Sequence, residues 1–174
     1  MENKYFEENE EKDYEQLVAF NEQTKLFWEL HRTPSKHYYD VSGVTRDGRE
    51  VIIELKRRYL NLIMNDEDKL VISGKTGQGK VFFDDNLLLS DHKGLDMLFD
   101  AIVDKKIPLY ITIANNCVII HNLLKLKTRP KRYTSIKSYS GGYQKFEYDS
   151  KQGLYIEDAV IYKINPEGKY IRNE

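Results

Sequence analysis

The sequence predicts an α/β protein in which helices flank a mixed central sheet. Three observations predict this class: an amphipathic segment over 13–32, a two-strand pattern over 40–58, and an apolar strand at 86–90 that leads into a helix and two further apolar strands. Helical and strand periodicities that alternate along one chain are typical of sheets covered by helices. With 174 residues, 40% of them hydrophobic, the chain is long enough for one domain with a sizeable core.

We expect one domain over 1–174, with an acidic start at 1–12, a core at 13–124, and a basic segment with closing strands at 125–174. The acidic start is expected to be a frayed tail, or else a mask over the basic segment. Because it is unlike a targeting peptide and no apolar run approaches a membrane span, we expect a cytoplasmic protein with no membrane partner. The single cysteine, Cys117, lies in an apolar strand and is interpreted as a core residue.

The strand that follows Gly48 carries an alternating pattern of charged and apolar residues. Ile52, Glu54, Lys56 and Arg58 share one face, because successive side chains of a strand point to opposite sides. Val51, Ile53 and Leu55 form an apolar opposite face. A charged face on a central strand suggests a functional site.

The turn before this strand decides whether Asp40 joins the charged face. A two-residue loop would place Asp40 opposite Leu55, on the apolar side. A three-residue loop, Arg46-Asp47-Gly48 with its glycine in the left-handed region, places Asp40 opposite Glu54. We predict the three-residue loop, because only this register yields one apolar and one charged face.

Two carboxylates and a lysine in this arrangement suit phosphodiester hydrolysis. Asp40 and Glu54 can bind Mg²⁺ or Mn²⁺, ions that take carboxylate and phosphate oxygens as ligands. Lys56, two residues beyond Glu54, points to the same place and can orient a water molecule or stabilise charge on the phosphate.

An aspartate, a hairpin of this length and a Glu-x-Lys strand resemble the core motif of the PD-(D/E)XK nuclease superfamily, which implies a restriction-endonuclease-like core. The resemblance implies that Asp40 and Glu54 are metal ligands and that Lys56 is the catalytic lysine; Tyr39 replaces the motif's proline. It also implies a glutamate on a preceding helix. The candidates within 13–32 are Glu15, Glu22 and Glu29, whose seven-residue spacing puts them on one helical face. Glu15 and Glu22, on the earlier turns, are preferred.

The elements after the motif follow the order that the resemblance implies. NLLLS at 86–90 is predicted to be a buried strand, and a helix capped by Ser90 or Asp91 follows it. PLYITI and CVIIHNL are then predicted to form a hairpin buried on both faces. Lys93, near the start of the helix, either faces phosphate or is a solvated lysine.

The chain between His121 and Lys145 contains basic but no acidic residues, although the net charge is only −1. Such a segment suggests a phosphate-tracking surface, and the alternative is a solvated basic loop. Its basic residues are Lys125, Lys127, Arg129, Lys131, Arg132, Lys137 and Lys145. The tyrosines interleaved with them are Tyr133, Tyr139 and Tyr143. Arg58 and Lys93 are further candidate nucleic-acid contacts.

A competing motif, GKTGQGK at 74–80, matches the glycines and lysine of a P-loop. Val81 stands where the magnesium-binding hydroxyl is needed, and no helix pattern follows. We therefore interpret the segment as a hairpin tip, whose Lys69, Lys75 and Lys80 could grip a nucleic-acid backbone.

These observations predict a Mg²⁺-dependent nuclease that acts on nucleic acid, with DNA preferred to RNA as substrate. A homodimer is compatible with the sequence. One alternative is an inactive nuclease-fold protein that binds nucleic acid or regulates another protein. Another is an interaction protein whose ELKRR strand carries ordinary surface charge.

Overall fold

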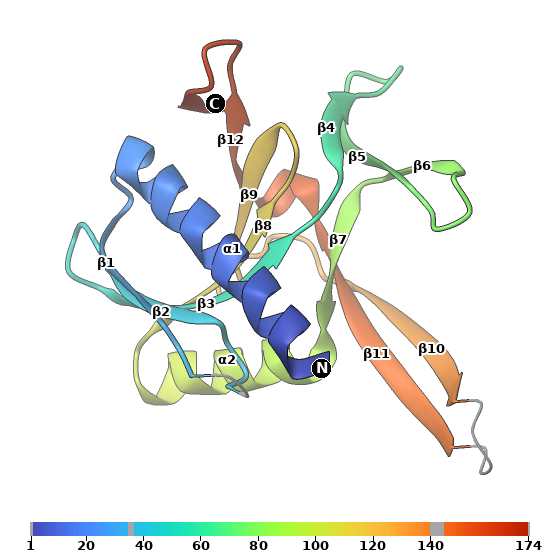
Figure 1. Ribbon diagram of the computed structural model, residues 1–174, viewed down its shortest axis with the longest axis horizontal. Coiled ribbons are helices and arrows are strands. Elements are labelled where there is room, and N and C mark those ends of the chain that lie inside the picture. Colours follow the sequence, from blue (N-terminus) through green and yellow to red (C-terminus); the bar gives the residue numbers. More distant parts are fainter. Residues whose placement is uncertain (1, 35–36, 140–144, 174) are drawn as a thin grey trace.

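The computed structural model describes residues 2–34, 37–139 and 145–173, and the side chains within 8–34, 37–134 and 150–173. Its α-helices are α1 (Glu2–Thr24) and α2 (Asp91–Val103), and most of the remaining regular structure is strand (Figure 1). A short 3-10 helix, η1 (Ile156–Asp158), lies near the end of the chain. The protein is therefore a mixed α/β structure dominated by sheet.

The main sheet is mixed, as predicted. Its order is β1 (Phe27–Arg32), β2 (Val41–Thr45), β3 (Glu50–Arg57), β8 (Ile107–Ile113), β9 (Cys117–Asn122), β12 (Val160–Ile164) and β13 (Tyr170–Arg172). Strands β3 and β8 are parallel, and the other neighbours are antiparallel. Because a parallel pair needs a crossover, α2 lies between β3 and β8 in the chain.

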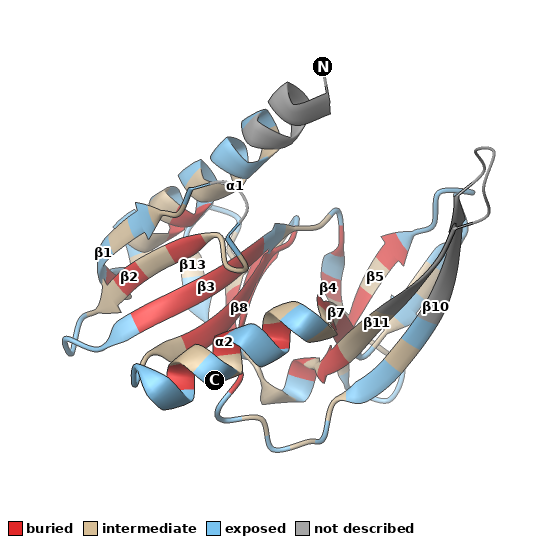
Figure 2. Cartoon of the chain, turned by 90° about the horizontal axis from the view of Figure 1, so that it is seen from below, coloured by how far each residue is buried: buried red, intermediate tan, exposed pale blue. Residues whose placement is uncertain are grey.

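The two helices cover opposite faces of the sheet (Figure 2). Leu17 and Phe20, three residues apart on α1, are fully buried with Val51, Ile53 and Leu55 of β3 in one core cluster. This is the apolar face that the strand alternation predicts. The side chains at even positions of β3 are therefore directed away from α1.

The opposite face of β3 packs against α2. Met97 is fully buried in a second core cluster that also contains Ile52 and Tyr110. Strands β8 and β9, between these layers, are buried along nearly their whole length, as predicted from their apolar runs. Cys117 of β9 is a buried core residue, and burial raises the pKa of its thiol to about 12.

Two smaller sheets extend from the main one. The first consists of β4 (Asn61–Met64), β5 (Leu70–Lys75) and β6 (Val81–Asp84), and the second of β7 (Asn86–Ser90), β11 (Lys145–Tyr155) and β10 (Lys131–Tyr139). The β10–β11 hairpin projects away from the body of the protein (Figure 1). Part of the basic segment, for which a solvated loop was the alternative interpretation, is therefore a strand.

The P-loop-like segment is the turn between β5 and β6. The backbone N–H of Thr76 donates to the carbonyl of Lys80 over 2.8 Å, and Gly79 has a φ of +79°. A strand follows this turn, so no helix N-terminus is present to bind phosphate. The prediction of a hairpin tip is confirmed.

The turn between β2 and β3 has the predicted three residues. The Thr45 N–H donates to the Arg49 carbonyl over 2.8 Å, and Gly48 has a φ of +81°. In this register Val41 pairs with Ile53, so Asp40 lies opposite Glu54 one residue further along. A left-handed residue is required here, which explains the glycine.

The predicted helix over 13–32 and the predicted frayed tail over 1–12 are both wrong at their boundaries. The helix begins at Glu2 and ends at Thr24, because Lys25 is left-handed, with a φ of +54°. The side chain of Asn21 then bonds both backbone groups of Phe27 and directs the chain into β1. Since β1 contains Glu29, that residue is on a strand rather than on the helix.

The closing segment and the second helix agree with expectation. Strand β7 and helix α2 lie where the apolar run and the Asp91 start predict them, although the Ser90 side chain makes no capping hydrogen bond. The Pro166–Gly168 turn joins β12 and β13, with Gly168 at a φ of +75°. Among the described residues, no helix combines the length and apolarity that a bilayer crossing requires.

Candidate active site

Asp40 is positioned by the loop that leads into β2. The Thr33 hydroxyl donates to the carbonyl of Tyr39 over 2.7 Å, and the Thr33 N–H donates to the carbonyl of Asp40 over 3.0 Å. The Asp40 carboxylate accepts the backbone N–H of Leu55 over 2.8 Å, beyond the last β2–β3 pair. This bond fixes Asp40 at the open end of the hairpin, next to Glu54.

Glu54 is a carboxylate in the interior of the main sheet. It lies on β3 between β2 and β8, and only 1% of the residue is exposed. Lys93 Nζ donates to both carboxylate oxygens, over 2.8 and 2.7 Å, and Lys56 Nζ lies 3.1 Å from one of them. A carboxylate this deeply buried needs such cationic partners, because an unpaired buried charge is very unfavourable.

The charges at this site act on one another. Burial raises the pKa of Glu54, the repulsion from Asp40 adds to the increase, and the two lysines oppose it. Burial would lower the pKa of Lys56, but the negative charges of Glu54 and Asp40 more than offset this, so its pKa is raised. Lys56 is therefore protonated beside a carboxylate that has an elevated proton affinity.

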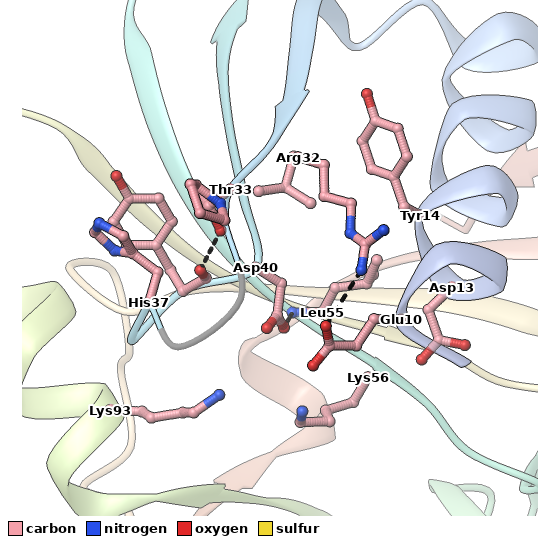
Figure 3. Close-up of a pocket in the computed structure, with 13 residues that line it drawn as sticks. Glu10, Asp13, Tyr14, Arg32, Thr33, His37, Asp40, Leu55, Lys56 and Lys93 are labelled. Carbon is pink, nitrogen blue, oxygen red and sulfur yellow. Dashed lines mark hydrogen bonds and ion pairs between the residues drawn. The ribbon is translucent and has the colours of Figure 1, made fainter. Parts of the chain in front are cut away.

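A cavity of about 200 Å³ opens beside Asp40 and is lined by charged side chains (Figure 3). In this view Lys56 and Lys93 lie below Asp40, and Glu10 and Asp13 of α1 lie to its right. Arg32 and Arg57 pair with those helix acids: Arg32 is 3.3 Å from Glu10, and Arg57 is 3.2 Å from Asp13. The cavity thus combines acidic groups that can hold a cation with basic groups that can hold an anion.

Two helix acids, Glu10 and Asp13, line the cavity beside Asp40, whereas the predicted Glu15 and Glu22 do not. Both glutamates are exposed and absent from the cavity lining. Asp13 lies one turn before Leu17, on the face that α1 buries. Burial raises its pKa, Arg57 and Lys56 oppose the shift, and the charge of Asp40 adds to it.

Asp13 could have been found from the sequence. The buried positions of α1 include 17 and 20, and 13 continues the same stripe at helical spacing. The heptad of glutamates instead follows a neighbouring, exposed stripe. Asp13 lies only two residues before Glu15, but on the stripe that α1 buries.

Two predicted nucleic-acid contacts, Arg58 and Lys93, are held by protein groups. Lys93 is bound to Glu54, as described above. The Arg58 guanidinium donates to the Leu88 carbonyl over 2.8 Å and to the Tyr110 hydroxyl over 3.0 Å. Both cations therefore border the site while also stabilising it.

The basic segment does not line the cavity beside Asp40. Its described members are exposed between β9 and the start of β10: Lys125, Lys127, Arg129, Lys131 and Arg132. Asp158 holds this connection by accepting the backbone N–H groups of Lys127 and Thr128. Lys131 lies 5.2 Å from the ring centre of Tyr133. Outside the described side chains lie Lys137, Tyr139, Tyr143 and Lys145.

The carboxylates at the site are the type of ligand that a divalent cation prefers, but few of their oxygens are free to bind one. Asp40, Glu54 and Asp13 offer the hard carboxylate oxygens that Mg²⁺ and Mn²⁺ prefer. Both oxygens of Glu54 are already bound by Lys93, so a cation must compete with that ammonium group. Within the described part of the chain, no group of three or more acidic, histidine or cysteine side chains is arranged to hold a metal ion.

No family model, no curated protein and no solved structure matches the chain.

Proposed function

We propose that this protein is a metal-dependent nuclease that hydrolyses nucleic-acid phosphodiester bonds. The observation that carries the proposal is the position of Asp40 opposite Glu54, with the ammonium groups of Lys56 and Lys93 on Glu54 at 3.1 Å or less. Carboxylates and lysines held together in this way can bind a cation and a phosphate side by side.

The order of the elements supports a restriction-endonuclease-like core. Helix α1 precedes the antiparallel β2–β3 hairpin, and α2 then crosses over to β8, which lies parallel to β3. This is the order that the PD-(D/E)XK resemblance implies. The three small strands β4 to β6 form an insertion between β3 and the second helix.

In this proposal Asp40 and Glu54 hold the Mg²⁺ or Mn²⁺, and Asp13 supplies the helix carboxylate beside them. The bound cation would lower the pKa of a water molecule and neutralise phosphate charge. Lys56, whose side chain is 46% exposed, orients that water or stabilises negative charge that develops on the phosphate. Lys93, which donates to both oxygens of Glu54, favours the ionised carboxylate and would also contact the phosphate.

The proposed substrate is nucleic acid, with DNA preferred to RNA. The exposed lysines and arginines at 125–132 can follow a phosphate backbone outside the cavity. Binding through such contacts weakens steeply as the salt concentration rises. Replacement of Lys127, Arg129 and Lys131 should therefore weaken binding and flatten its salt dependence.

One observation favours a second candidate, a nuclease-fold protein that binds nucleic acid without cleaving it. The positive charges of Lys93 and Lys56 balance the negative charges of Glu54 and Asp40, so the cluster is neutral without a metal ion. A protein of this kind would bind oligonucleotides with the same affinity whether or not Mg²⁺ is present.

The test is a cleavage assay on labelled DNA and RNA with Mg²⁺ or Mn²⁺. We expect Asp40→Ala, Glu54→Gln and Lys56→Ala each to reduce the rate by about a hundredfold or more. Asp13→Asn should also reduce it, whereas Glu15→Ala and Glu22→Ala, on the exposed face of the same helix, should not. Cleavage that survives both Asp40→Ala and Lys56→Ala would reject the proposal. Binding without cleavage under every metal condition would establish the second candidate.

A further inference from the structure

A second hollow lies beyond the end of β3, where the chain enters the small β4–β5–β6 sheet. It is a groove of about 400 Å³, within the size range of small-ligand sites. Its lining includes Arg57, Arg58, Tyr59, Lys75 and Phe82. A combination of arginine, lysine and aromatic side chains is typical of surfaces that bind single-stranded nucleic acid.

Tyr59 presents an aromatic ring at this groove. The residue is 78% exposed, and the guanidinium carbon of Arg57 lies 5.8 Å from the ring centre. A large ring left in water at the edge of a hollow is available for stacking, and a neighbouring guanidinium favours the same type of ligand. The exposed ring of Tyr59 therefore indicates a site for a ligand that stacks on it.

Part of the groove lining is apolar and includes Leu60, Ile72 and Phe82. A Cβ atom on Gly74 would lie 2.5 Å from Leu60 Cδ2 and 2.8 Å from Phe82 Cζ. Glycine at this position therefore allows Leu60 and Phe82 to pack over the β5 backbone. Apolar lining beside an exposed tyrosine suits the face of a nucleobase.

The charge of the groove is positive. Arg57, Arg58 and Lys75 line it together with one acid, Asp84. The Asp84 carboxylate accepts hydrogen bonds from the Asp85 N–H at 2.9 Å and from the Asn86 side chain at 2.8 Å. One of its oxygens is therefore already bound by the next two residues of the chain. A phosphate group entering the groove therefore meets more cations than anions.

The groove is continuous with the candidate active site. Arg58 and Leu88 line both this groove and a neighbouring cavity of about 240 Å³. Glu54, Lys56 and Lys93 also line that neighbouring cavity. From Lys56 to Tyr59 the chain advances three residues, at most about 10 Å, so Tyr59 lies within reach of a nucleotide adjacent to one bound at Glu54.

We propose that the groove binds an unpaired nucleotide, with its base stacked on Tyr59 and its phosphate near Arg57 and Lys75. The substrate class is thus nucleic acid with a single-stranded end, flap or gap, because a base inside a duplex is already stacked and paired and cannot reach the ring. This inference rests on the proposed function, since it names the substrate of the same site.

The test is fluorescence anisotropy with a labelled single strand, a blunt duplex, and a duplex with a single-stranded overhang, all in EDTA so that no cleavage occurs. Wild-type protein should bind the single strand and the overhang more tightly than the blunt duplex. Tyr59→Ala should weaken binding of the two unpaired substrates by roughly 5- to 100-fold, the range for loss of one stacked base, and Tyr59→Phe should retain it.

Trp28→Ala is the matched control, because Trp28 is 70% exposed on the edge strand β1 and lies outside the groove. It should leave all three affinities unchanged. Equal affinity for blunt and unpaired substrates, no binding to any of them, or wild-type binding by Tyr59→Ala would each overturn the groove proposal.

The Mg²⁺ cleavage assay separates the two proposals. One outcome is cleavage that requires Asp40 and Lys56 but is unaffected by Tyr59→Ala and equally fast on paired and unpaired strands. This outcome would leave the nuclease proposal intact and reject the groove proposal. Tyr59-dependent binding of unpaired strands without any cleavage would reject the nuclease proposal and support the groove as the ligand site of a binding protein.

Discussion

The two ends of the β2–β3 hairpin each carry a carboxylate–cation contact of 2.7 Å, but their surroundings differ greatly. At the turn, Arg49 Nε pairs with Asp47, and both side chains are more than half exposed, at 58% and 57%. At the open end, Lys93 Nζ pairs with Glu54, where the side-chain exposures are 24% and 1%. Equal distances therefore join groups with very unequal access to water.

The pKa values of the two acids shift in opposite directions. The Thr45 hydroxyl and Arg49 lower the pKa of Asp47, because water still solvates the carboxylate and each contact favours its charged form. Burial raises the pKa of Glu54 despite its two lysines. The exposed contact at the turn forms once the hairpin is folded and contributes little to stability. The buried contact at the open end is needed to keep the charge of Glu54 inside the sheet.

The largest effect on stability is expected from Lys93→Met. The change keeps the aliphatic length but leaves Glu54 buried with only Lys56 as a cationic partner, which should lower the free energy of unfolding by about 1–3 kcal/mol. The loss of Lys93 also raises the pKa of Glu54 further above its ordinary value of 4.5. The folded variant then holds a proton that the unfolded chain releases more readily.

The pH dependence follows from the direction of that shift. A folded-state pKa that is raised contributes stability at low pH, and this contribution is lost as the pH rises through the folded value. The deficit of Lys93→Met should therefore be larger at about pH 8 than at about pH 5 in urea unfolding. Lys106→Met is the control, since Lys106 is also 25% exposed but pairs with the half-exposed Asp104. Equal deficits for the two variants would contradict the comparison.

Sequence reasoning predicted the part of this site that depends on local rules. The position of Asp40 opposite Glu54 follows from the alternation along β3 and from the requirement for a left-handed glycine at 48. Both signals lie within one hairpin, where turn geometry determines the register. The adjoining strand β7 and helix α2 follow from similarly local patterns.

The parts that were missed depend on contacts between distant segments. The Lys93–Glu54 bond joins residues 39 positions apart and arises only when α2 packs against the sheet. Helix α1 ends at Thr24 because the next residue, Lys25, is left-handed, although the sequence pattern continues as one amphipathic helix. Neither the packing angle of a helix nor an isolated positive φ at lysine has a reliable local signal.

A smaller effect is expected from Gly48→Ala, which tests how the register is maintained. A Cβ at this position meets no atom within 4 Å, so the cost comes only from the φ of +81°. Left-handed backbone disfavours alanine by about 1–2 kcal/mol. Unfolding measurements should show a loss of this size, with Gly48→Asn losing less, because asparagine tolerates this region better. A loss of activity beyond the loss of folded protein would show that the register itself had slipped.

The smallest effect is expected from Arg49→Ala, at the exposed end of the hairpin. Water screens both partners of the Asp47 contact, and ordering two exposed side chains opposes its formation. The free energy of unfolding should therefore match the wild type within experimental error at low and high salt, although the contact is as short as that between Lys93 and Glu54. A deficit as large as that of Lys93→Met would mean that distance, rather than burial, determines what an ion pair contributes to this hairpin. The Glu54 cluster would then behave like ordinary surface charge. That result would favour the alternative in which the Glu-x-Lys strand has no catalytic role.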